Sequence, residues 1–138
     1  MEKNAVIKIL SNATMENDEL IEVLTHGKYK LEDNIYKATY NETEISGMKG
    51  TETSLIIEED VITLERVGST STKMVFKKNE VTVALYNTPY GMLELEIFTK
   101  GLEKEIDENG GKVLIEYEMR VIGQEPFKTK INLEIETK

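Results

Sequence analysis

Apolar and polar side chains alternate with a period of two along the C-terminal segment of the chain. Over residues 127–137, most odd-numbered positions are apolar, among them Phe127, Ile131 and Leu133, and the even-numbered positions carry lysine, asparagine or glutamate. Successive side chains of an extended chain point to opposite faces, so this pattern buries one face and leaves the other in water. The segment is therefore predicted to be a half-buried β-strand.

Similar runs recur along the chain as far as the N-terminus. Roughly ten strand-like segments are separated by turn-forming residues, such as Asp33-Asn34 and Gly110-Gly111. Short strands at such even spacing are typical of an antiparallel β-sandwich or an up-and-down β-barrel. Residues 100–111 are the one candidate for a helix, and their pattern is ambiguous. We expect an all-β fold in a single domain, residues 1–138.

The last two strand-like segments are predicted to form a hairpin around a loop of residues 123–125. One register pairs Val121 with Phe127 and Tyr117 with Ile131, and it also brings lysines beside glutamates. A shift of two residues would keep every side chain on the same face. The alternation therefore favours this register without excluding the shifted one.

The charge of the chain argues against several partners. Asp and Glu number 26 against 17 Lys and Arg, which gives a formal net charge of -9. This sign is wrong for a surface that tracks phosphates, so nucleic acid is not expected as a partner. It also disfavours binding to anionic membrane surfaces.

The chain has no cysteine, so it can form neither a disulfide nor a zinc–thiolate site. The first residues carry only a short apolar run interrupted by Lys8, which matches neither a signal peptide nor a membrane span. We expect a cytoplasmic protein.

Two glycine-containing stretches superficially resemble ligand-binding loops. Residues 47–54, GMKGTETS, lack the Gly-Lys-Ser/Thr ending of a phosphate loop and run into a strand pattern, so a tight turn is expected. Residues 107–118 partly match a calcium loop, but Gly111 stands where an oxygen ligand is required. A hairpin turn at Asn109-Gly110 explains that stretch.

His26 is the only histidine, and it follows apolar residues in a strand-like segment. A histidine-based metal site needs further ligands of this type, so no metal is expected. We interpret His26 as a solvated or hydrogen-bonded strand residue, with pH sensing or ligand contact as the alternative.

Pairs of glutamates two residues apart project from one face of their strands. Paired acids can hydrolyse a substrate held between them, but these alternate with apolar residues, so a solvated outer face is predicted. No set of nucleophile, base and orienting group is recognisable, and neither a catalytic residue nor a cofactor is expected. The pairs are Glu94 with Glu96, Glu116 with Glu118, and Glu134 with Glu136.

Six tyrosines and several methionines occupy strand positions or their ends. Such side chains most often form core and rim. In a barrel, however, aliphatic walls with a few phenol hydroxyls and adaptable methionines are also what a small apolar ligand would contact. The candidate ligand-binding residues, as pocket wall and phenol donors, are Tyr36, Tyr40, Tyr86, Tyr90 and Met119.

The stretch NTPYG, residues 87–91, separates two strand patterns. Pro89 has no N–H to donate to a strand ladder, and Gly91 can adopt a positive φ. The stretch is therefore predicted to be a corner between strands.

Three boxes of the sequence resemble the YwiB-like family, bacterial proteins of unknown function. They are GMKGTETS at residues 47–54, ALYNTPYGMLELEIFTK at residues 84–100, and ENGGKVLIEYEMRVIGQ at residues 108–124. The most specific element is TPYG, residues 88–91, and the resemblance runs through nearly the whole chain. It implies a closed, lipocalin-like (calycin-type) meander barrel of about 8–10 strands, and no activity, because the family has no established reaction.

Two hypotheses for function follow. The first is a cytoplasmic barrel without catalytic activity that binds a small, mainly apolar ligand in its interior. The second is an interaction module, either a monomer that binds another protein or a homodimer, which uses an outer sheet face. An enzyme is the third and least supported reading.

Overall fold

The computed structural model describes residues 2–13, 20–42, 50–68, 71–88, 91–121 and 123–137. These residues form ten antiparallel strands and no helix, so none of them belongs to a helix that could cross a membrane. The strands are β1 (Glu2–Ala13), β2 (Leu20–Glu32), β3 (Ile35–Asn41), β4 (Glu52–Ile57), β5 (Ile62–Val67), β6 (Ser71–Phe76), β7 (Val81–Thr88), β8 (Gly91–Asp107), β9 (Gly110–Val121) and β10 (Phe127–Thr137).

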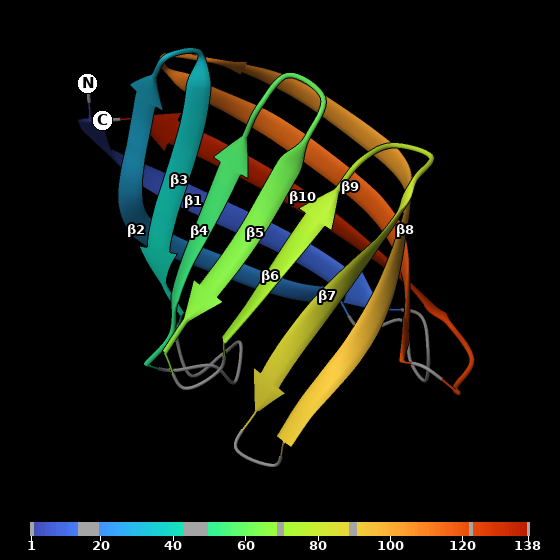
Figure 1. Ribbon diagram of the computed structural model, residues 1–138. Coiled ribbons are helices and arrows are strands. Elements are labelled where there is room, and N and C mark those ends of the chain that lie inside the picture. Colours follow the sequence, from blue (N-terminus) through green and yellow to red (C-terminus); the bar gives the residue numbers. More distant parts are fainter. Residues whose placement is uncertain are drawn as a thin grey trace.

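The strands close into a single barrel. Each strand pairs with its neighbours in the sequence, and β1 closes the sheet by pairing with β10. Figure 1 shows this meander, with β1 and β10 side by side and the β7–β8 hairpin extending beyond the neighbouring strands. The all-β, up-and-down barrel that the sequence predicts is confirmed.

Residues 100–107, part of the only helix candidate, continue strand β8 instead. The register between β8 and β9 shifts between Thr99 and Gly101, so Lys100 is an extra residue in the strand. Such a bulge bends a strand without ending it. Two separate runs in the sequence thus form one long strand.

The hairpin between β9 and β10 forms, but its preferred register is wrong by two residues. Met119, and not Val121, lies opposite Phe127. The Gln124 N–H donates to the carbonyl of Val121 at 2.9 Å, and pairing resumes only after Pro126, which has no N–H for a ladder. The connection is therefore longer than a three-residue loop, while Tyr117 and Leu133 keep their predicted inward face.

The tight turns are made by residues that tolerate a left-handed backbone. Asp33 and Asn34 have φ values of 53° and 67°, as a two-residue hairpin requires. At the β8–β9 hairpin, Gly111 has a φ of 146°, and a Cβ there would lie 1.9 Å from the carbonyl oxygen of Glu105. Only glycine fits this close approach of two strands.

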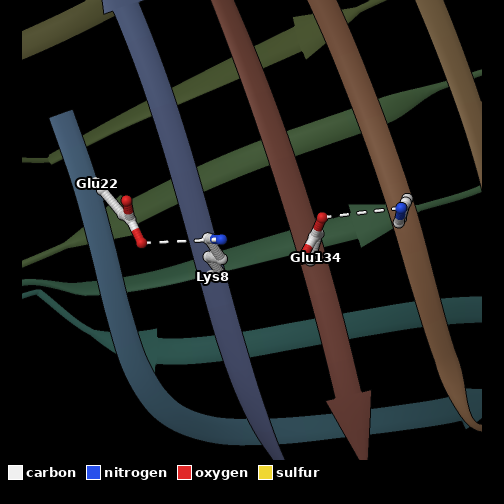
Figure 2. A network of polar contacts seen from close by, with 4 residues as sticks. Lys8, Glu22 and Glu134 are labelled. Atoms are coloured by element: carbon white, nitrogen blue, oxygen red, sulfur yellow. Dashed lines mark ion pairs between the residues drawn. The ribbon is translucent and has the colours of Figure 1, made fainter. Parts of the chain in front are cut away.

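The outer face of the barrel carries ion pairs between neighbouring strands. Figure 2 shows Lys8 on β1 beside Glu22 on β2, at 3.8 Å, and Glu134 on β10 pairs with Lys112 on β9 at 3.9 Å. Each exposed pair of this kind stabilises the folded state by only about 0–1 kcal/mol. Its main effect is to favour the strand register that places opposite charges side by side.

The glutamate pairs predicted for an outer face lie there. Glu96 pairs with Arg120 at 2.5 Å, and Glu118 pairs with Lys100 at 2.8 Å. The lysine lowers the pKa of Glu118 through this hydrogen bond. These carboxylates are thus held on the surface by lysine and arginine.

Candidate functional site

The inner face of the barrel differs between its two ends. We call the end with the β2–β3, β4–β5 and β8–β9 turns the packed end, uppermost in Figure 1, and the opposite end the open end. Inner side chains near the packed end have almost no accessible surface, for example Tyr29, Ile57, Ile62 and Phe76. A side chain without accessible surface has no probe-sized space beside it, so the interior is filled around these four residues.

A polar row crosses the inner face nearer the open end. Its members are register partners on successive strands, so they lie at one level of the barrel. The alternation that points Ile62 and Leu64 into the core also points the arginine of β5 inward. The row consists of Tyr40 on β3, Thr53 on β4, Arg66 on β5 and Thr72 on β6.

A buried carboxylate stands at one end of this row. Glu42 directly follows β3, and its backbone N–H donates to the carbonyl of Thr51 at 2.8 Å. Its carboxylate accepts a 2.5 Å hydrogen bond from the hydroxyl of Thr53 and also interacts with the Tyr40 hydroxyl. Burial, with the charge of Glu42, raises the pKa of Tyr40 well above its usual value. The Tyr40 phenol therefore stays protonated at neutral pH.

Arg66 is the cation of the row, and its hydrogen-bonding capacity is incompletely used. Its Nε lies 3.7 Å from a Glu42 carboxylate oxygen, which is an ion pair but too long for a hydrogen bond. This buried Nε has no hydrogen-bond partner in the described part of the chain. A buried donor without an acceptor is unfavourable, and such groups often mark a place where something binds.

A second orphaned group lies on the opposite wall. Thr99 on β8 has no accessible surface, and its hydroxyl oxygen has no partner among the described residues. Its register partner Tyr117 contacts Phe76 and interacts with Thr129. Burial raises the pKa of Tyr117, and the charge of Arg66 opposes this shift, so the guanidinium and the phenol are close.

The inner face beyond the polar row is apolar and only partly covered. Met119 and Val121 on β9 and Ile131 on β10 pack against the core while keeping some accessible surface. Leu93 on β8, at the same rim, is 45% exposed. The open end thus combines an apolar wall with a small set of polar groups around Arg66, the composition typical of small-molecule sites.

The five predicted ligand residues are not all brought together. Tyr40 lies in the polar row, the backbone of Tyr86 occupies the same level on β7, and Met119 lines the open end. Tyr36 lies toward the packed end, where its ring stacks on Tyr29 with centroids 5.8 Å apart. The side chain of Tyr86 and the whole of Tyr90 lie outside the described residues.

The sequence prediction omitted Arg66 and Glu42. A signal for each was present, because Arg66 continues the inward series of Ile62 and Leu64, and Glu42 continues that of Tyr40. A charged residue at an inward position is a candidate for a functional site, since a charge is rarely buried without a partner.

The other motifs lie away from this site. His26 is exposed on the outer face of β2. Two depressions, of about 800 Å³ over β8–β10 and 450 Å³ over β1–β3, also lie on the outside. Among the described residues there is no group of three or more His, Cys, Asp or Glu side chains able to hold a metal ion.

The structure describes only part of each of the two stretches that were predicted to be a turn and a corner. Thr88 pairs with Gly91, so NTPYG connects two strands as predicted, while Pro89 lies outside the described residues. The GMKGTETS stretch leads through Gly50, which has a φ of 92°, into β4, whereas residues 43–49 lie outside the described part.

Comparison with known proteins places the chain in a family. The model of a domain of unknown function, DUF1934, matches residues 7–134. The chain belongs to this family. A curated relative, the uncharacterized β-barrel protein YwiB of Bacillus subtilis (strain 168), is 31% identical over 106 residues, which cover 76% of this chain and 72% of the relative.

A solved structure matches the fold of this chain over nearly its full length. The crystal structure of the YwiB protein from Bacillus subtilis superimposes with a TM-score of 0.89 at 25% identity, covering 99% of this chain and 93% of that one. The family resemblance inferred from the three boxes is confirmed. The family is described as a domain of unknown function, and the curated relative as an uncharacterized β-barrel protein.

Proposed function

We propose that this DUF1934 protein is a binding barrel without catalytic activity, which holds a small, mainly apolar molecule at the open end of its interior. The observation that carries the proposal is the asymmetry of the inner face. Tyr29, Ile57, Ile62 and Phe76 fill the packed end, whereas at the open end Met119 and Leu93 keep accessible surface and the Nε of Arg66 has no partner among the described residues. A rigid, filled packed end with an incompletely filled open end suits a binding protein.

Methionine methyl groups test this proposal. In nuclear magnetic resonance spectra of protein with isotope-labelled methionine methyls, added octanol should shift the signal of Met119 at the open end. Met92 on β8 is the matched control, because it is 61% exposed and its position points outward. A Met119 signal that stays unchanged, or moves no more than that of Met92, would contradict interior binding.

A second candidate is self-association through the outer face of β7. Val81, Val83 and Leu85 all point outward, and each is more than half exposed. Three aligned apolar side chains on one strand form a patch of the kind that marks protein contacts. Sedimentation velocity over a range of concentrations should then detect a dimer that Val83→Glu abolishes. A wild-type monomer at every concentration would exclude this candidate.

A further inference from the structure

The polar row defines which chemical group of a ligand it can receive. Glu42 is already contacted by the Thr53 hydroxyl, by Tyr40 and by Arg66. The guanidinium has this one distant carboxylate neighbour among the described residues, and its Nε–H lacks an acceptor. The group of the row that lacks a hydrogen-bond partner is therefore a donor, and a ligand with an acceptor atom would satisfy it.

The charge of that acceptor follows from the same groups. A cationic ligand would be repelled by Arg66 and would have to compete with Thr53 and Arg66 for the Glu42 carboxylate. A dianion such as phosphate would place two further negative charges beside Glu42, with Arg66 as the only cation within the row. A carboxylate carries a single charge and matches the planar guanidinium through two parallel hydrogen bonds.

We propose that the ligand is an amphipathic monocarboxylate, whose carboxylate is bound by Arg66 and whose apolar part lies against Met119, Val121 and Ile131. This rests on the proposed function, since it assigns a head group to the ligand of the open end. The buried, partly desolvated position strengthens such a pair relative to one in water.

Calorimetric titration of the whole protein with matched acids and alcohols tests the proposal. Hexanoate and octanoate are compared with hexanol and octanol at neutral pH, where the acids are ionised. A charge-assisted hydrogen bond of this kind favours the acid over its alcohol by about tenfold or more. Because this comparison uses wild-type protein, it does not depend on whether any variant folds.

Variants then assign the preference to one residue. The double variant Glu42→Gln/Arg66→Met removes both charges, so neither is left buried without a partner. It should bind octanol as before and lose the preference for octanoate. Arg66→Lys should keep part of the preference. Arg120→Met, which removes the other arginine of the chain from the outer face, is the matched control and should behave as wild type.

The outcomes separate this inference from the proposed function. Equal binding of acid and alcohol, or an acid preference that survives in the double variant, would overturn the carboxylate assignment while leaving a binding barrel. Binding of neither acid nor alcohol would contradict the proposed function and this inference together.

Discussion

At the scale of single residues, the buried tyrosines give the fold a dependence on alkaline pH. Burial raises the pKa of Tyr29, Tyr40 and Tyr117 above the usual value of 10.0. Tyr29 also donates a 2.7 Å hydrogen bond to the carbonyl oxygen of Asp107. These phenols keep their protons in the folded barrel at a pH where an unfolded chain would lose them.

The stability contributed by these protons should therefore be complete below about pH 10 and decline above it. Above that pH the unfolded state binds fewer protons than the folded state, so the free energy of unfolding falls as the pH rises. Denaturant unfolding at a series of alkaline pH values measures the decline, and ultraviolet absorbance of phenolate reports ionisation. Ionisation of all six tyrosines near pH 10 in a barrel that stays folded would refute this.

Substitution of two glycines by alanine distinguishes the cost of a left-handed backbone from that of a steric clash. Gly111 and Gly123 both have positive φ, but a Cβ meets the Glu105 carbonyl only at Gly111, whereas Gly123 has nothing within 4 Å. We expect Gly111→Ala to lower the free energy of unfolding by about 2–4 kcal/mol, and Gly123→Ala by about 1 kcal/mol. Urea denaturation measures both, and equal losses would show that the close approach is unimportant.

At the scale of elements, the pairing of β6 with β7 is the weakest seam of the barrel. Its register is limited to Ser71 with Asn87 and Thr72 with Tyr86. Threonine side chains bridge the rest, because the Thr82 hydroxyl donates to the Val75 carbonyl at 2.6 Å and the Thr72 hydroxyl donates to that of Leu85 at 3.2 Å. The barrel should open here first.

Hydrogen exchange of backbone amides measures this opening. Amides of β6 and β7 should exchange faster than those of β8 and β9, which pair from Leu95 to Asp107. Thr82→Val removes one bridging donor and should accelerate exchange at the seam by the equivalent of about 1 kcal/mol, while leaving β8–β9 exchange unchanged. Equal protection of the two strand pairs in wild-type protein would contradict a weak seam.

Local patterns in the sequence predict the strands well, because alternation requires only that one face be buried. They predict register less well, since a shift of two residues keeps every face, as at β9–β10. Alternation also indicates that Arg66 and Glu42 point inward, but it does not predict that they pair, because the pair spans three strands. Tyr36 shows the same limit, as it lies on β3 with Tyr40 but nearer the other end of the barrel.

At the scale of the whole molecule, the barrel combines a filled half with a mouth that is polar on one wall and apolar on another. The fold that this chain shares with YwiB supplies the rigid frame, and the inward residues of this chain supply the chemistry. Folds of this kind serve many functions, so the identity of the interior side chains must decide.

Native mass spectrometry of protein purified from cells, recorded beside a denatured sample, tests binding at the open end most directly. A binding barrel should carry a reproducible additional mass that denaturation releases, and the double variant Glu42→Gln/Arg66→Met should carry less of it. A protein that is always bare, and that remains bare after incubation with octanoate or octanol, would contradict the account.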